Sequence, residues 1–217
     1  MEYFRNRHEA GRDLARDLLE YAGRHDVVIL ALPRGGVPVG YEIAQALHAP
    51  LDLLIVRKLG VPGEEELAFG AIATGNIRVL HDTVIRHTGL SDAAIEQVTR
   101  DEAHELLRRE QAYRGHRPPP AIEGRIVILV DDGLATGSTM RAAIAAVRQR
   151  RPARIVVAVP VASHETCEEL RHEADEVHCS ITPLLFSGVG QWYEDFSQTT
   201  DAEVRELLYH LSGAARG

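Results

Sequence analysis

Short apolar runs alternate with amphipathic stretches along most of the 217-residue chain. The apolar runs are typical of strands and lie at 27–32, 51–56, 125–130, 154–160 and 176–181. Helical spacing is found at 9–21, 37–47, 91–113, 138–150 and 165–174. Strands and helices that alternate in this way usually form a parallel sheet with helices on its faces. The sequence therefore predicts an α/β fold with a central, mostly parallel sheet flanked by helices.

Two segments interrupt this alternation. Residues 57–76 contain Gly and Pro with an acidic middle, which favours a long mobile loop with short strands at its end. One or two further short strands are expected in "IRVLHDTVI", residues 77–85. Ser91 is placed to cap the long charged helix that follows, so that 91–115 forms a helical insertion.

The C-terminal part differs in composition from the rest. Residues 181–200 lie outside the strand–helix alternation and contain the single Trp of the chain, and a terminal helix is expected at 201–212. We therefore expect one domain over residues 1–217, with a core at about 1–180 and a small C-terminal unit beside it.

Charge and cysteine content limit the partners that the chain can have. The formal net charge of −8 at pH 7 argues against a broad surface for nucleic acid or anionic membranes. No apolar run approaches the ~18–20 residues that span a bilayer, and the first residues lack the apolar stretch of a signal peptide. Cys167 and Cys179 fit a reducing cytosol and are expected to be structural. We expect a cytoplasmic protein that holds any anionic ligand in a local pocket.

The stretch "ILVDDGLATGST", residues 128–139, is the most informative for function. An apolar strand runs into two aspartates and then into a turn of small and hydroxyl residues, with Ala135, Thr136, Gly137, Ser138 and Thr139 where a helix starts. Small residues let backbone N–H groups approach an anion, and the helix N-terminus adds partial positive charge. The Walker and Rossmann glycine patterns are both missing from the sequence. The turn is therefore predicted to bind a phosphate group.

Asp131 and Asp132 would repel a phosphate placed directly on them. One sugar-width away, however, they can accept hydrogen bonds from a diol. Acids for ribose hydroxyls beside a phosphate-binding turn predict a ribose 5-phosphate ligand. The alternative is an ordinary strand–helix turn with a capping acid, for which one aspartate would be enough.

The stretch "VILVDDGLATGST" resembles the signature by which type I phosphoribosyltransferases bind 5-phosphoribosyl 1-diphosphate (PRPP). More narrowly, the chain is similar to a little-characterised prokaryotic branch of that family, some of whose members are fused to a hydrolase domain. The segments that carry this likeness are "LPRGGVPVG", "VRKLGVPGEEELAFGAIA", "YRGHRPP" and "VGQWYEDF". The resemblance implies PRPP and a small-molecule acceptor as ligands, pyrophosphate as product and Mg²⁺ as cofactor. It leaves a homodimer open.

The resemblance also implies roles for the turn and strand end that precede the signature. Arg34, Gly35 and Gly36 would bind pyrophosphate, commonly through a non-proline cis peptide, although a tight strand–helix turn is the plain alternative. Arg57 and Lys58 would form a cationic pair for the diphosphate, with the following loop closing over the site. Lys58 is the single lysine among 24 basic residues. We expect Lys58 to act in catalysis, unless it is a solvated residue at a strand end.

Catalysis is thus assigned to Lys58, Asp131 and Asp132, and the two acids would contact the metal only indirectly, through ribose hydroxyls or water. Residues 181–200 would form the hood, the cap that selects the acceptor base in this family. The predicted acceptor-binding residues are Val189, Trp192, Tyr193 and Asp195. Aromatic faces can stack on a planar ring while an acid reads its edge. The alternative is that the aromatic residues form a small satellite core.

The expected reaction transfers the 5-phosphoribosyl group of PRPP to a nitrogen acceptor, a nucleobase or a related heterocycle. Purine-salvage relatives usually carry an aspartate at the position of Ala135, and uracil enzymes usually carry proline at the position of Asp132, so the acceptor is left open. A catalytically weak PRPP-binding regulator is the alternative. A hydrolase of phosphoribosyl compounds would need a water-activating base, and the sequence indicates none.

Overall fold

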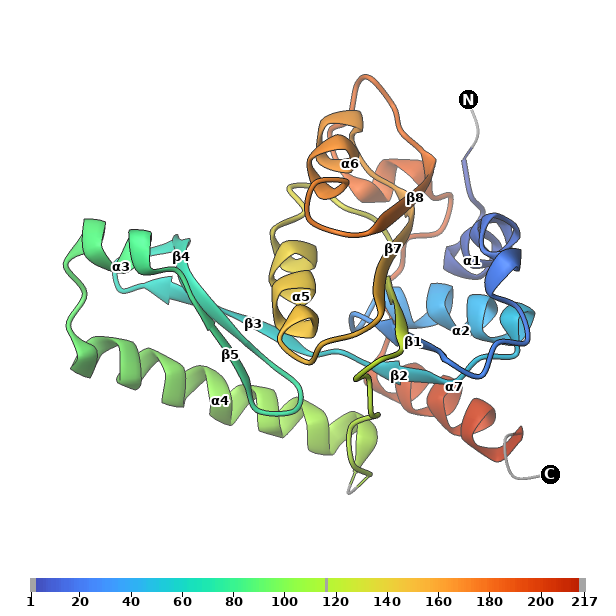
Figure 1. Ribbon diagram of the computed structural model, residues 1–217. Coiled ribbons are helices and arrows are strands. Elements are labelled where there is room, and N and C mark those ends of the chain that lie inside the picture. Colours follow the sequence, from blue (N-terminus) through green and yellow to red (C-terminus); the bar gives the residue numbers. More distant parts are fainter. Residues whose placement is uncertain (1–2, 116, 215–217) are drawn as a thin grey trace.

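A five-stranded parallel sheet forms the centre of the molecule in the computed structural model, which describes residues 3–115 and 117–214 (Figure 1). The ends of the predicted domain and His116 of "YRGHRPP" lie outside the described residues. The strands run in the order β2 (Leu51–Leu53), β1 (Val27–Ala31), β6 (Ile126–Val130), β7 (Arg154–Val161) and β8 (Glu176–Ile181). Each neighbouring pair is parallel. β1 and β6 are buried along their whole length, which is why they read as unbroken apolar runs.

Helices cover both faces of this sheet, as predicted. One face packs against α1 (Arg7–Asp17) and α2 (Gly36–Leu47), and the other against α5 (Ser138–Arg148) and α6 (His164–Leu170) (Figure 1). Along β1, Ile29 belongs to the first of these cores and Val28 to the second, because successive strand residues face opposite sides. The first helix starts earlier than predicted because Asn6 caps it, and the residues Leu19–Tyr21 form a separate 3-10 turn.

The segment expected to be a mobile loop is instead an ordered hairpin. Its strands and the next one form a second, antiparallel sheet of β3 (Val56–Val61), β4 (Glu64–Ala73) and β5 (Ile77–Leu80). Leu59, Phe69 and Ile72 are buried in this unit. The prediction of a loop at 57–76 was therefore wrong for most of the segment: Gly60 and Gly70 lie within strands, whereas Gly63 and Gly75 form the turns at positive φ. Residues 77–85 provide one strand, and the rest begins the helix α3 (Asp82–Thr88).

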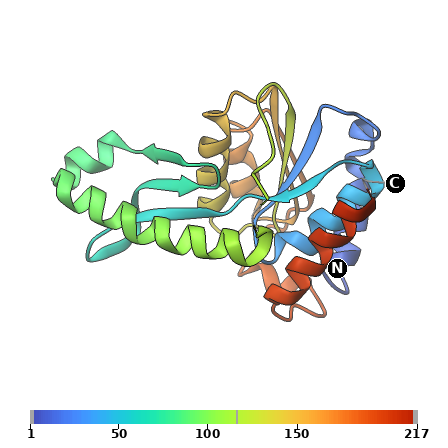
Figure 2. The same cartoon turned by 90° about the horizontal axis from the view of Figure 1, so that it is seen from below.

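The long helix α4 (Asp92–Arg114) supports this second sheet, and Ser91 caps it as predicted, with the Ser91 side chain accepting a hydrogen bond from the Ala94 N–H at 3.2 Å. Figures 1 and 2 show the sheet, α3 and α4 extending together as an arm from the central sheet. The buried guanidinium of Arg114 anchors the arm by donating to Asp52 Oδ1 at 2.9 and 2.8 Å.

The C-terminal part begins after β8 with a loop and the 3-10 turn η2 (Val189–Trp192) and ends in α7 (Asp201–Ala214). Figure 2 shows α7 beside α2 and near α4. Cys167 on α6 and Cys179 on β8 form a disulfide, which differs from the expectation of reduced thiols. In the part of the chain that the structure describes, no helix combines the length and the apolar character needed to cross a membrane.

Candidate functional site

The strand order of the central sheet places a topological switch point between β1 and β6. From β1 the chain continues to β2 on one side, whereas β6 lies on the other side and leads on to β7. Ligands of open α/β sheets bind outside the carboxyl ends of the strands at such a switch point. The turn with Arg34, Gly35 and Gly36 leaves β1 here, and the turn with Asp131 and Asp132 leaves β6. The fold thus brings together two motifs that are far apart in the sequence.

The two turns touch so closely that only glycine fits between them. A Cβ atom on Gly35 would lie 2.0 Å from Asp132 Oδ2, and one on Gly36 would lie 2.6 Å from the carbonyl oxygen of Val130. Gly35 has an ordinary φ of −61°, so close approach, rather than a positive φ, requires glycine at this position. The Pro33–Arg34 peptide bond is cis, as the resemblance implied.

The two aspartates differ in their environments. The Asp131 carboxylate accepts a hydrogen bond from the Asp132 N–H at 2.9 Å. Burial, together with the nearby charge of Asp132, raises the pKa of Asp131 well above its ordinary value. The carboxylate of Asp132 instead accepts a hydrogen bond from Arg7 Nε at 2.7 Å. The pair can therefore offer the ribose hydroxyls two carboxyl groups that have different protein partners. Arg7 was not predicted from the sequence.

The predicted phosphate turn opens to the surface at the start of α5. Ala135, Thr136 and Thr139 are exposed, Ser138 is half-buried, and Gly137 has a left-handed φ of 67° just before the helix begins. The N-terminus of α5 therefore points its N–H groups and partial positive charge out of the sheet edge.

Thr166 on α6 holds this turn in place from behind. Its hydroxyl donates a hydrogen bond to the carbonyl oxygen of Ala135 at 3.0 Å. A Cβ atom on Gly137 would lie 2.8 Å from the Thr166 methyl group. Sequence reasoning missed Thr166, because the helix that carries it follows a different strand.

Arg34 lies in the turn after β1, and its side chain is partly exposed. Its guanidinium is 3.5 Å from Asp201 Oδ1, and the Tyr113 hydroxyl donates to the same oxygen at 2.9 Å. Arg34, the cation in the predicted pyrophosphate turn, and Tyr113, near the end of α4, thus share one oxygen of Asp201, the first residue of α7. An exposed ion pair of this kind is weak enough for a bound diphosphate to replace it.

Arg57 and Lys58, the predicted cationic pair, are successive residues of β3 and have different surroundings. Arg57 pairs with Glu102 of α4, with Nε 2.5 Å from Oε2. Lys58 is paired in register with Ala71, and both residues line a cavity of about 400 Å³ beside α5, together with Ser138. Successive residues of a strand point their side chains to opposite faces of the sheet, whereas a mobile loop would leave the two side chains free to point the same way. Arg57 is thus paired with Glu102, whereas Lys58 shares a cavity with Ser138 of the predicted phosphate turn, and both residues line a second cavity of about 470 Å³ beside α4. That Arg57 and Lys58 act together on the diphosphate stays a prediction.

Tyr193 belongs to a small core and is not available to stack on an acceptor. The residue is 6% exposed, packs with Phe4 and Val161, and donates its hydroxyl to the carbonyl oxygen of Asp132 at 2.6 Å. Burial raises its pKa. The ring of Trp192 stacks on Tyr3 at 5.7 Å. For Tyr193, the satellite-core alternative describes the structure better than acceptor stacking does, whereas Trp192 is only half-buried.

The other two predicted acceptor-binding residues lie nearer the surface. Val189 is half-buried, and its side chain lies against Gly133, where a Cβ atom would be 2.5 Å away. Asp195 is exposed and accepts a hydrogen bond from the Ser197 N–H at 2.9 Å, which lowers the pKa of Asp195. Val189 thus borders the start of the phosphate turn, whereas Asp195 is held in its own loop.

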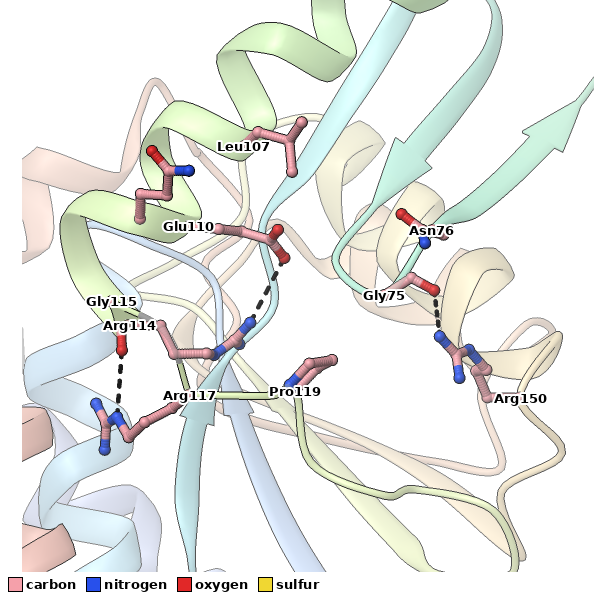
Figure 3. A pocket seen from close by; sticks show the side chains of 10 residues that line it. Gly75, Asn76, Leu107, Glu110, Arg114, Gly115, Arg117, Pro119 and Arg150 are labelled. Atoms are coloured by element: carbon pink, nitrogen blue, oxygen red, sulfur yellow. Dashed lines mark hydrogen bonds and ion pairs between the residues drawn. The ribbon is translucent and has the colours of Figure 1, made fainter.

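A cavity of about 410 Å³ lies away from these residues, between the end of α4 and the β4–β5 turn (Figure 3). Its guanidinium groups have protein partners: Arg150 binds the carbonyl oxygen of Gly75, and Arg114 lies 3.5 Å from Glu110. None of the predicted site residues lines it. Over residues 3–115 and 117–214, no three His, Cys, Asp or Glu side chains cluster in a way that could hold a metal ion.

The sequence matches the family described as "Phosphoribosyl transferase domain" over residues 2–194. It is 48% identical over 208 residues to the Mycobacterium tuberculosis H37Rv protein named "Putative phosphoribosyl transferase Rv0571c", which covers 96% of this chain and 47% of that protein. It is 30% identical over 169 residues to "Bifunctional protein PyrR" of Geobacter sulfurreducens, covering 73% of this chain and 90% of that protein.

The crystal structure of TT1426 from Thermus thermophilus is similar to this structure over nearly its whole length. The TM-score is 0.88 and the identity 42%, with 97% of this chain and 99% of that chain covered. The chain spans about half the length of the M. tuberculosis relative.

Proposed function

The chain belongs to the phosphoribosyl transferase domain family, and on this premise we propose that it transfers the 5-phosphoribosyl group of PRPP to a nitrogen acceptor and releases pyrophosphate. The single observation that carries the proposal is the meeting of the turn at Gly35 with Asp131 and Asp132, beside the helix N-terminus at Ser138. These groups can receive a phosphate, a ribose and a diphosphate next to one another.

In this proposal, each part of PRPP is assigned a group at this edge of the sheet. The N–H and hydroxyl groups of residues 135–139 would hold the 5-phosphate, and Asp131 and Asp132 would hold the ribose hydroxyls. The cis peptide turn and Arg34 would hold the diphosphate, with Arg34 exchanging Asp201 for the ligand. Lys58 would follow the diphosphate as charge builds on the leaving oxygen.

The reaction breaks the bond between C1 of the ribose and the diphosphate oxygen and forms a bond from C1 to the acceptor nitrogen. Catalysis would depend on positioning and on charge stabilisation rather than on a covalent nucleophile. Two carboxyl groups at the ribose site, without a third ligand, fit a Mg²⁺ ion held mainly by PRPP and water. When bound, Mg²⁺ would neutralise charge on the diphosphate.

The acceptor in this proposal is a nucleobase or a related heterocycle. At position 135 an alanine replaces the acid of purine-salvage relatives, so this side chain cannot carry a proton. Val189 borders the phosphate turn, and with Trp192 and Asp195 it keeps a proposed role in acceptor binding. We also propose that a longer version of the chain carries a separate hydrolase domain, consistent with the greater length of the M. tuberculosis relative.

A PRPP-binding regulator with weak catalysis is the second candidate. The observation that favours it is that Arg57 pairs with Glu102 and Arg34 with Asp201, so two cations predicted for the diphosphate have protein partners. In an enzyme, PRPP would displace at least the Arg34 pair.

The decisive experiment measures pyrophosphate release from PRPP and Mg²⁺ with a panel of nucleobases and related heterocycles, alongside PRPP binding by calorimetry. Asp131→Asn should lower release at least about tenfold, the loss expected for one hydrogen bond to a charged group. Asp101→Asn on the exposed side of α4 is the matched control. Release with one acceptor supports the enzyme, and binding without release supports the regulator. A wild-type protein that does not bind PRPP would refute both.

A further inference from the structure

Arg7 occupies an unusual place for a cation. It is the first residue of α1, where the helix dipole disfavours positive charge, and only 11% of its side chain is exposed. Its neighbours on the same helix, such as Arg12 and Arg16, have mostly exposed side chains. A charge kept in an unfavourable and largely buried position needs partners that compensate for it.

Those partners come from two separate parts of the site. Arg7 Nε donates to Asp132 Oδ2 at 2.7 Å, and Arg7 Nη1 donates to the carbonyl oxygen of Ser197 at 2.7 Å. The guanidinium carbon also lies 4.0 Å from the centre of the Phe196 ring. One planar side chain therefore connects the aspartate after β6 with the loop after η2.

The contact also fixes the orientation of the Asp132 carboxylate. Oδ2 is held by Arg7 on one side and lies against Gly35 on the other, where a Cβ atom would be 2.0 Å away. Oδ1 lies farther from this Cβ position, at 3.0 Å, and 15% of the Asp132 side chain is exposed. The main chain of Asp132 is held by the same region, because its carbonyl oxygen accepts the Tyr193 hydroxyl.

We propose that Arg7 is a positioning residue, which presents Asp132 Oδ1 to the ribose and couples this carboxylate to the hood at residues 181–200. The inference rests on the proposed function, in which Asp132 binds the ribose of PRPP. Binding of PRPP then moves or orders the hood through Arg7, and the acceptor cap responds to the sugar substrate.

A purely structural role for Arg7 makes a different prediction. A simple strut between α1 and the hood would affect the unfolding temperature when it is removed, but it would not transmit PRPP binding to the hood. Trp192 separates the two cases, because it is the only tryptophan of the chain and lies in η2, within the hood. Its fluorescence reports on the hood without knowledge of the acceptor.

The experiment titrates PRPP with Mg²⁺ into wild-type protein and into Arg7→Gln, Arg7→Lys and Arg12→Gln, measuring the Trp192 fluorescence change and, by calorimetry, the affinity. Wild type and Arg12→Gln should show the same fluorescence change. Arg7→Gln should bind PRPP at least about tenfold more weakly, as for loss of a charge-assisted hydrogen bond, and should lose the fluorescence change at saturating PRPP. Arg7→Lys keeps the charge but cannot make both contacts in the same plane, so the fluorescence change should also be reduced.

The outcomes distinguish this inference from the proposed function. If wild type binds PRPP and Arg7→Lys gives the affinity and the fluorescence change of Arg12→Gln, Arg7 has no positioning role, while the proposed function stands. If wild type does not bind PRPP, the proposed function fails and this inference fails with it. Arg7→Lys also decides the case if Arg7→Gln does not fold. In a double-mutant cycle with Asp132→Asn, the losses of affinity should not be additive.

Discussion

Replacing Gly35 by alanine tests the packing on which the candidate site depends. Gly35 and Asp132 belong to turns from different strands, and a Cβ atom on Gly35 would be 2.0 Å from Oδ2, 2.5 Å from Cγ and 3.0 Å from Oδ1 of Asp132. Ordinary contacts of a Cβ atom begin at 3.4 Å. The Asp132 carboxylate must therefore move by more than ~1 Å to reach an ordinary contact distance. The backbone at Gly35 need not change, because its φ of −61° already suits alanine.

The size of the effect follows from what this movement breaks. Asp132 would lose its 2.7 Å hydrogen bond with Arg7, and losing one bond of this charged type costs about 1.5–3 kcal/mol. We expect PRPP affinity to fall by roughly 10- to 100-fold, the same free energy expressed as a dissociation constant. Overpacking of this kind destabilises by about 1–3 kcal/mol, which for a chain of this length lowers the unfolding temperature by roughly 2–12 °C.

Calorimetric titration with PRPP and Mg²⁺ and a thermal unfolding curve measure the two effects. Gly188→Ala is the matched control, because a Cβ atom there would meet nothing within 4 Å. The double variant Gly35→Ala with Asp132→Ala should be no less stable than Asp132→Ala alone, since the clashing atoms are gone. Wild-type affinity and stability in Gly35→Ala would refute the reasoning, and so would a double variant whose stability losses simply add.

Three further predictions address other parts of the molecule. Lys58→Arg should lower kcat more than it raises the KM for PRPP, and near-wild-type kcat in steady-state assays would leave this lysine without a catalytic role. Thr166→Val keeps the side-chain shape but loses the 3.0 Å hydrogen bond to the Ala135 carbonyl, so PRPP affinity measured by calorimetry should fall by about three- to tenfold. Hydrogen bonds from Arg108 and a second arginine lower the pKa of Glu105 from 4.5 to about 2. Glu105→Gln should therefore be less stable than wild type in urea unfolding at pH 7, and this difference should disappear as the pH falls from about 4.5 to 2, whereas a constant difference would contradict the assignment.

Much of the central fold could be predicted from hydrophobic patterning. β1 and β6 are buried on both faces, so they had to be continuous apolar runs, and the helices between strands show a periodic apolar face. The hairpin at Val56–Ala73 could not be predicted in this way, because its burial depends on α4, which follows it in the chain. Glycines that look like loop signals are tolerated there, since Gly70 allows the close approach of the neighbouring strand, with a Cβ atom 2.3 Å from the Val79 carbonyl oxygen.

Some residues of the candidate site could likewise be predicted from the sequence, and others could not. The aspartates and the phosphate turn form one continuous stretch, and their chemistry depends on residue type and short spacing, so they could be identified without a fold. Tyr193 looked equally suited to stack on a ligand, but its burial and its bond to the Asp132 carbonyl place it in a core. An aromatic residue has the same apolar face for a ligand as for a core, and only the packing around it distinguishes the two.

The sequence by itself determined the strands and helices of the central sheet, the two aspartates beside a predicted phosphate turn, and the family. Only the tertiary structure decided that Arg57 pairs with Glu102 while Lys58 lines a cavity with Ser138, and that Arg7 reaches Asp132, 125 residues away in the chain. The physical reason is range. Hydrophobic patterning and local motifs depend on residues that are a few positions apart in the chain. An ion pair between distant residues forms only after folding has brought the turns that follow β1 and β6, and helix α1, to the same edge of the sheet.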